Sequence, residues 1–265
     1  MSLLPASSPP SVDRVRDNTP PPSSDEEAAR ALEALMWPHD LDSVVSGSLL
    51  ETLRERYCIP EEFVLVVPDP GQRAYDPIPR GFALTLDARE AGLRLPLHPI
   101  IVSCLSMWRI SPSQVAPNSW RYLVAFLGEC YYANITPTRN LFLSCFRVGG
   151  YFLSARIGFR VGGAPSNNKG WKGWFFYVSW SRDWGFGIRW AARAIDNAAP
   201  SLNDEERRDL ERLREILPGS QAIRAMNEQW LAEAGLSPAS QGMFMAGDTY
   251  VLLIFSGCEP LLVLL

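Results

Sequence analysis

The sequence predicts an α+β fold, with a central helical bundle at about residues 86–147 packed against a small antiparallel aromatic hairpin at about residues 151–180. Three observations predict it. Apolar residues recur at helical spacing through the centre of the chain, aromatic residues typical of strands follow them, and helical patterns return towards the end. At 265 residues, 47% of them hydrophobic, the chain is long enough to build one large core or two small ones.

The first segment, residues 1–24, carries six prolines and six serines among few apolar side chains. Such a composition cannot bury enough surface to fold, so we expect a disordered leader. Residues 25–59 form a predicted N-terminal helical arm. Its first helix starts at a Ser-x-x-Glu capping box on Ser24 and ends before Pro38, and its second covers about residues 48–57.

A central domain is predicted at residues 60–197, beginning with a short β-branched strand at residues 63–67. His98 and Pro99 have the pattern of an N-cap and first helical position. Asn118 is expected to open the longest helix, in which Gly128 lies on the apolar stripe and lets a neighbour approach closely. A further helix is predicted to start near Pro137 and to end at Gly149 and Gly150. The apolar face of the helix after Pro99 consists of Ile101, Cys104, Leu105 and Trp108.

Two aromatic strands, residues 151–160 and 173–180, are expected to make the hairpin, because each combines aromatic and β-branched side chains. The remaining residues, 198–265, are predicted as a second helical arm with an apolar end. Its helices are expected at residues 204–216 and 220–234, and its end is expected to contain a strand.

We expect no signal peptide at the start of the chain and no membrane helix at its end. The N-terminal residues lack the basic and apolar regions of a signal peptide, and Gly257, Glu259 and Pro260 interrupt the apolar end, so no membrane segment is expected. The five cysteines are dispersed and odd in number. We therefore expect an intracellular protein, with the nucleus as one option.

Positive charge is concentrated in the middle of the chain. Residues 81–199 contain 13 lysines and arginines against 5 aspartates and glutamates, while both flanking segments are acidic. This asymmetry allows weak, salt-sensitive binding of nucleic acid, or neutralisation of the central domain by its own arms. The predicted nucleic-acid contacts are Arg147, Arg156, Arg160, Lys169, Lys172 and Trp171.

No catalytic pattern emerges from the sequence. A DDE-type transposase needs three carboxylates around two divalent ions, and the centre of the chain offers only Asp87, Glu90, Glu129, Asp183 and Asp196. The first two have the spacing of a capping box, and the third lies on an outer helix face. The Asp-Thr/Ser-Gly triplet of an aspartic protease and the paired-aspartate turn of a reverse transcriptase are both missing. Without Cys-x-x-Cys spacing, and with two histidines, His39 and His98, no zinc site can be built, so we expect no enzyme, no metal and no cofactor.

Four groups of residues carry a family resemblance across about residues 60–195. They are Glu90-Ala91-Gly92-Leu93-Arg94, Pro96-Leu97-His98-Pro99, Pro117-Asn118-Ser119-Trp120, and Trp171-Lys172 with Phe175-Phe176. Together they resemble the plant family of Gypsy-type transposase, or plant transposon-protein, domains. The resemblance implies an origin in LTR retroelements of a plant genome. It implies no catalysis, because the family supplies no active site to carry over.

Two functional hypotheses follow. The first is a non-enzymatic, retroelement-derived structural or interaction protein, whose helical arms bind protein partners or a second copy. The second is a nucleic-acid-binding module that uses the basic central domain. A transposase or nuclease is retained only because the name of the resembled family suggests it.

Overall fold

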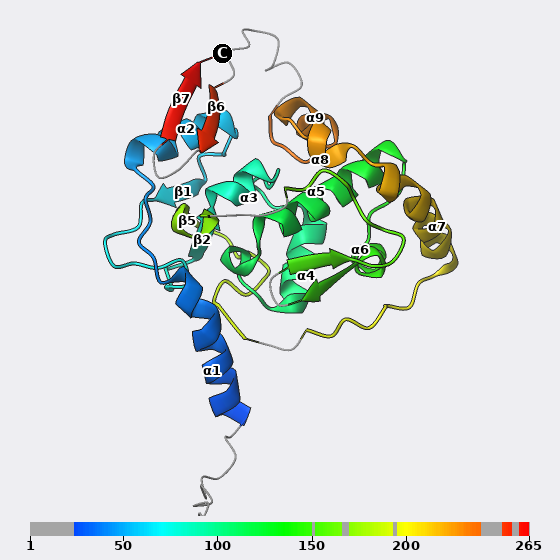
Figure 1. Ribbon diagram of the computed structural model, residues 1–265, viewed down its shortest axis with the longest axis horizontal. Helices are drawn as coiled ribbons and strands as arrows, with labels where there is room; N and C mark the ends of the chain where they lie inside the picture. Colours follow the sequence, from blue (N-terminus) through cyan, green and yellow to red (C-terminus); the bar gives the residue numbers. More distant parts are fainter. Residues whose placement is uncertain are drawn as a thin grey trace, which may run out of the picture.

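The computed structural model describes residues 24–149, 152–165, 170–192, 195–239, 251–255 and 260–264. It confirms the α+β class, with helices gathered around a small antiparallel sheet (Figure 1). Apart from Ser24, the predicted disordered leader lies outside the described residues.

Helices make up most of the body. The α-helices are α1 (Ser24–Met36), α2 (Gly47–Arg56), α3 (Leu86–Glu90), α4 (Pro99–Trp108), α5 (Pro117–Tyr132), α6 (Arg139–Cys145), α7 (Asp204–Gly219), α8 (Ala222–Ala225) and α9 (Glu228–Glu233). Three 3-10 turns accompany them: η1 (Trp37–His39), η2 (Pro112–Gln114) and η3 (Trp171–Gly173). The strands are β1 (Phe63–Val66), β2 (Gly81–Thr85), β3 (Phe146–Gly149), β4 (Phe152–Ala155), β5 (Phe175–Trp180), β6 (Val251–Phe255) and β7 (Pro260–Leu264).

The predicted aromatic hairpin is wrong in its pairing. β4 pairs with β3, whereas β5 lies in the middle of a second sheet, between β1 and β2. The predicted helix that was to end at Gly149 instead stops at Cys145, because buried and exposed residues alternate through β3 in the manner of a strand. The sequence of β2 does not alternate between apolar and polar residues, because all five of its residues are buried.

Helix starts match the sequence at some positions and differ at others. His98 caps α4 as predicted, its Nδ1 accepting from the amide of Ile100 at 3.2 Å. The predicted capping box at Asp87 is wrong, because Thr85 caps α3 through the amide of Ala88. Asn118 does not cap α5 either; its amide group donates to the carbonyl of Pro165.

The close approach expected at Gly128 is present. A Cβ atom added there would lie 2.0 Å from the ring of Trp230, so the absent side chain makes room for this aromatic residue at α9. The predicted helix at residues 220–234 is divided into α8 and α9, while α7 begins with a capping box between Asn203 and Glu206.

Residues of both predicted arms share one hydrophobic cluster with the central segment. Leu50 and Leu53 of α2, and Leu213 and Leu217 of α7, belong to it. In Figure 1, α1 stands away from the body, whereas α2 and α7 lie against it. The hydrophobic core therefore extends beyond both limits of the predicted central domain, residues 60–197. The division into domains remains a prediction.

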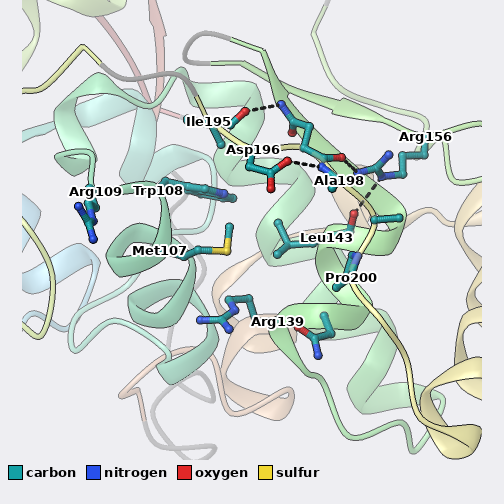
Figure 2. A pocket seen from close by; sticks show the side chains of 13 residues that line it. Met107, Trp108, Arg109, Arg139, Leu143, Arg156, Ile195, Asp196, Ala198 and Pro200 are labelled. Carbon is teal, nitrogen blue, oxygen red and sulfur yellow. Dashed lines mark hydrogen bonds between the residues drawn. The ribbon is translucent and has the colours of Figure 1, made fainter.

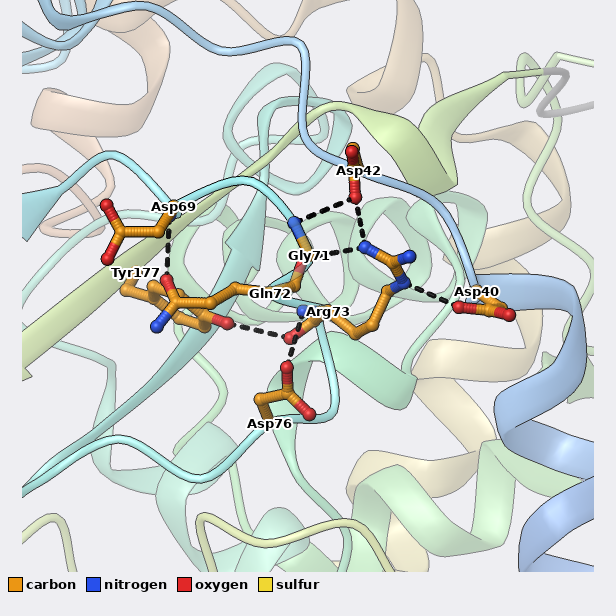
Figure 3. A network of polar contacts seen from close by, with 8 residues as sticks. All are labelled: Asp40, Asp42, Asp69, Gly71, Gln72, Arg73, Asp76 and Tyr177. Atoms are coloured by element: carbon orange, nitrogen blue, oxygen red, sulfur yellow. Dashed lines mark hydrogen bonds and ion pairs between the residues drawn. The ribbon is translucent and has the colours of Figure 1, made fainter.

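A polar network attaches the N-terminal arm to the sheet (Figure 3). Arg73 donates from Nε to Asp40 at 2.5 Å and from Nη1 to Asp42. Its own amide donates to Asp76 at 2.7 Å, and its carbonyl accepts from the hydroxyl of Tyr177 at 2.8 Å. Arg73 thus joins the chain before α2 to β5 through both side-chain and backbone contacts.

At the C-terminal end, β6 and β7 form an antiparallel pair, in agreement with the strand predicted there. In the ranges that the structure describes, every helix is too short or too polar to cross a membrane.

Within the part of the chain that the structure describes, Arg89 stands out as a buried cation without a hydrogen-bond partner. Arg89 is fully buried, and none of its three side-chain nitrogens has a hydrogen-bond partner. Its guanidinium lies 5.2 Å from the ring centroid of Tyr57, and burial, with the nearby charge of Arg94, lowers its pKa to about 9. The fold therefore holds this cation in an environment that disfavours its charge.

Replacing Arg89 with methionine is expected to raise the free energy of unfolding by up to about 2 kcal/mol. Exchange of a buried ion pair for packed apolar side chains stabilises by up to about 4 kcal/mol, and loss of the desolvated cation–π contact with Tyr57 offsets about 2 kcal/mol of such a gain. Urea denaturation of both proteins measures the difference. A lower stability for Arg89→Met would show that the guanidinium has a stabilising partner.

Candidate functional site

A pocket of about 560 Å³ opens beside the end of α4 (Figure 2). Its walls come from three parts of the chain: residues 107–109 at the end of α4, residues 139, 140 and 143 of α6, and the segment 195–200 that precedes α7. Arg156, immediately after β4, completes the lining. These parts are distant in sequence and meet only in the fold.

Arg156 and Asn197 fix the wall formed by the late segment. Arg156 donates from Nε to the carbonyl of Leu143 at 2.9 Å and from Nη2 to the carbonyl of Asn197 at 2.6 Å. The side chain of Asn197 in turn pairs with both the amide and the carbonyl of Val148, at 2.8 and 2.7 Å. The segment is therefore bonded to α6 and β3, and Arg156 adds a positive charge held in place by backbone oxygens.

Trp108 supplies a polar atom without a partner. The residue is 3% exposed, and its indole Nε1 makes no hydrogen bond. In Figure 2 the ring extends into the pocket with its nitrogen-bearing end foremost. A buried N–H without an acceptor costs about 1–3 kcal/mol, and because this nitrogen has no accessible surface, an acceptor in the pocket could reach it only if the ring shifted.

Two further arginines line the pocket. Arg139, in the first turn of α6, is exposed and donates from Nη1 to the hydroxyl of Ser103 at 3.3 Å. Arg109 ends α4 in a left-handed conformation, with φ 54° and ψ 42°. Helices commonly end with glycine in this conformation, and a larger side chain there is disfavoured, so Arg109 is held in a strained backbone at one end of the pocket.

The charge of the lining is strongly positive. Against three arginines stands one carboxylate, Asp196, whose Oδ1 accepts from the amide of Ala198 at 2.8 Å within its own turn. Arginine guanidinium groups match the geometry of carboxylates and phosphates. The arrangement can bind an anion.

The residues predicted to contact nucleic acid fall into separate places. Arg147 lies exposed on β3, Arg156 lines the pocket, and Arg160 is exposed beyond β4. Lys172 is half-buried in η3, with Nζ 5.9 Å from the ring centroid of Trp171.

Trp171 itself is 7% exposed and packs edge-on against His39, so its ring presents no face for a base. Lys169 lies outside the described residues. Arg156 thus lines the same pocket as Arg109 and Arg139, which sequence spacing did not indicate, although Arg109 and Arg156 lie at opposite sides of it (Figure 2).

The five carboxylates considered for catalysis lie on different elements. Asp87 and Glu90 are on α3, Glu129 accepts from Ser220 Oγ at 2.5 Å, and Asp183 accepts from the amide of Gly185. Asp196 is the pocket residue. Among the residues described, no three His, Cys, Asp or Glu side chains are placed to hold a metal ion.

Cys104 lies in α4, the helix that His98 caps, and its thiol is not reactive. Cys104 is fully buried, and burial raises its pKa to about 12. Burial also lowers the pKa of His98, whose Nδ1 is engaged as the cap of α4. A thiol in this environment stays protonated and inert.

Comparison with known proteins gives one family. Residues 84–150 match the family model described as "Putative gypsy type transposon". Over this segment the chain is related to Gypsy-type transposon proteins. No curated protein and no solved structure matches the chain.

The Gypsy-type segment contains only part of the pocket. Residues 107–109 and 139–143 lie inside it, while Arg156 and residues 195–200 lie beyond its end. It is also shorter than the resemblance seen in the sequence, which extended over about residues 60–195. The plant origin implied by that resemblance remains a prediction.

Proposed function

We propose that this transposon-related protein is a non-enzymatic interaction protein, and that its partner is nucleic acid bound weakly at the arginine-lined pocket. The observation that carries the proposal is that Arg109, Arg139 and Arg156 all line one concave site, which presents a single acid. A phosphate backbone is the most abundant polyanion that such a site can meet in a cell, and arginine–phosphate contacts provide sequence-independent affinity.

The expected affinity is low because few charges take part. Each phosphate neutralised by an arginine contributes a salt-dependent term, and the pocket offers only three arginines, one of which already bonds two carbonyl groups. The acidic segments on both sides of the central segment repel a nucleic acid, so the binding surface cannot extend far beyond the pocket. Binding should therefore be local, weak and sensitive to ionic strength.

The absence of catalysis is part of the proposal. Glu129 and Asp196 already accept hydrogen bonds from neighbouring groups, and Asp87 and Glu90 lie on another helix. Two-metal phosphoryl transfer requires several carboxylates to hold the metal ions. The pocket presents only one carboxylate and is otherwise positively charged, which supports binding without catalysis.

Reversal of one charge tests the site. We expect Arg139→Glu to abolish measurable binding of a fluorescent oligonucleotide, because it replaces a phosphate contact with repulsion. Wild-type affinity should fall about ten- to fortyfold between 50 and 200 mM salt if two or three phosphates are contacted. Fluorescence anisotropy measures both effects.

Lys172→Glu serves as the matched control, since Lys172 lies at η3 and not in the pocket. This variant should retain most of the affinity. Equal losses for both variants, or an affinity independent of salt, would contradict the pocket as the nucleic-acid site.

A second candidate is association with another copy through the N-terminal arm. A row of exposed apolar residues favours it: Trp37 is 79% exposed, Leu41 48% and Val44 59%. Apolar association weakens little with salt. Sedimentation of the wild type and of Trp37→Ser at the same two salt concentrations distinguishes it from phosphate binding.

A further inference from the structure

We infer that the exposed face of the β3–β4 pair stacks a base of a single-stranded nucleic acid on the ring of Phe152, beside a phosphate contact from Arg147. The inference deepens the proposed function and rests on it for the class of partner. Three observations carry it: the exposure of Phe152, its position on one face with Arg147, and a stretch of sequence that is basic and without acids.

The pairing register places Phe152 and Arg147 on the same face. Gly149 pairs with Phe152, and Arg147 pairs with Ser154. Residues that pair directly point to the same side of an antiparallel sheet, and neighbours along a strand alternate between its two sides. Arg147 and Phe152 are therefore diagonal neighbours, about 7–8 Å apart, which is within reach of long and aromatic side chains.

This face is open, whereas the opposite one is packed. Phe152 is 56% exposed, and a Cβ atom added at Gly149, directly across from it, would meet nothing within 4 Å beyond its neighbours in the chain. Val148 and Leu153 are buried, and the amide of Leu153 donates to the hydroxyl of Ser119 on α5 at 2.9 Å. Phe152 therefore presents aromatic surface to solvent.

The charge around the ring is positive. Residues 146–161 contain three arginines, Arg147, Arg156 and Arg160, and no aspartate or glutamate. Proteins bind single strands on such surfaces, because every base has an aromatic face that can stack and every linkage carries a negative charge. An apolar peptide fits less well, since the guanidinium groups would lose water without gaining an anion.

A duplex cannot use the ring in this way. Its bases are stacked on one another, so Phe152 would reach one only after a base step had been unstacked, which costs free energy. The bases of a single strand are accessible without this cost. The geometry therefore favours single strands.

The pocket wall adjoins the same pair of strands. Asn197 bonds the amide and the carbonyl of Val148 at 2.8 and 2.7 Å, which places it at the outer edge of β3. A single strand of several nucleotides is flexible and can contact both this face and the pocket.

The test first removes the ring. A fluorescent single-stranded oligothymidylate of about 12 nucleotides, within the usual range of about 4–16 for such surfaces, is titrated with the full chain by anisotropy. We expect Phe152→Ala to weaken binding about fivefold to a hundredfold, because stacking of one base contributes this much. Phe152→Trp should bind at least as tightly as the wild type, since its ring is larger.

The test then removes the bases. A strand with abasic sites in place of the bases keeps every phosphate, so it should bind more weakly than oligothymidylate, and Phe152→Ala should cause no further loss with it. Arg147→Gln should instead weaken the binding of both ligands. It should also reduce the slope of log affinity against log salt by about 0.7, the value for one phosphate of a single strand.

Ile157→Ser is the matched control. Ile157 is 99% exposed just beyond β4, and it is apolar but has no ring, so its replacement should leave the affinity unchanged. Because Arg147, Phe152 and Ile157 are all exposed, circular dichroism should show each variant folded like the wild type.

The outcomes separate the inference from the proposed function. Unchanged affinity in Phe152→Ala, with binding abolished by Arg139→Glu, would keep the pocket and overturn the stacking site. Loss of affinity in Phe152→Ala, with full affinity in Arg139→Glu, would keep the stacking site and exclude the pocket.

Two other results would also contradict the inference. One is equal affinity for oligothymidylate alone and for the same strand paired with its complement. The other is an equal loss for Ile157→Ser and Phe152→Ala, the pattern expected of a general apolar surface that docks protein.

Discussion

Replacing Arg94 with methionine is expected to lower the free energy of unfolding by about 3–5 kcal/mol, the cost of leaving a buried charge without its partner. Arg94 pairs with Glu228, with Nη2 and Oε2 2.5 Å apart and the two side chains 5% and 16% exposed. It also donates from Nη1 to the carbonyl of Arg89 at 2.7 Å. The change thus leaves the carboxylate of Glu228 without its cation and with Ser237 Oγ as a remaining donor, while the carbonyl of Arg89 keeps its bond from the amide of Gly92 at 3.0 Å. Urea denaturation measures the loss.

The control removes both charges together. In Arg94→Met combined with Glu228→Met, no charge remains unpaired, and much of the stability should return, because isolated charges cost more than a well-packed apolar pair. Unchanged stability in Arg94→Met alone would show that Glu228 finds solvent or another partner. Arg94 and Arg89 are expected to respond in opposite ways because Arg94 is paired with an acid, Glu228, whereas the side chain of Arg89 has no hydrogen-bond partner.

The protein is expected to lose about 3 kcal/mol of stability as the pH falls from 6.5 to about 4, through His39 alone. Burial, with a smaller effect from the charge of Lys172, lowers the pKa of His39 from 6.5 to about 4. In this window the unfolded chain binds a proton that the folded chain does not, so stability is complete above pH 6.5 and decreases towards pH 4. The shift corresponds to about 1.4 kcal/mol per pKa unit.

His39→Phe isolates this contribution. The ring of His39 lies between Trp171 and Trp190, at centroid distances of 5.1 and 4.8 Å, and its Nδ1 has no partner. Phenylalanine preserves the aromatic packing and cannot titrate. Carboxylates affect both proteins alike. The unfolding free energy of the wild type, minus that of His39→Phe, should therefore rise by about 3 kcal/mol from pH 4 to pH 6.5. Parallel curves would show that His39 titrates normally in the fold.

Local signals in the sequence predicted the helices well. The cap at His98, the apolar face that includes Trp108, and the small residue at Gly128 are all found in the structure. The first two depend on neighbours within one or two turns of the same helix, whereas the residue that Gly128 admits, Trp230, comes from α9. Such patterns are determined by short-range geometry, which a single sequence displays directly.

Strand pairing and the pocket could not be predicted in the same way. β5 joins two strands that precede it by about a hundred residues, and no local pattern encodes that choice over the nearer β4. Arg109 and Arg139 are thirty residues apart and belong to different helices. Sequence reasoning placed Trp108 in the core correctly, but the missing partner of its N–H is visible only once its surroundings are known.

The order of the central sheet limits how the protein can be dissected. Its middle strand, β5, lies beyond the end of the Gypsy-type segment, and one of its edge strands, β1, lies before the beginning. A fragment cut to residues 84–150 would retain α3 to α6 but lose β5, and β2 would lose all but its last two residues. Deletion studies should therefore keep at least Val45 to Ala222, the span of the shared hydrophobic cluster.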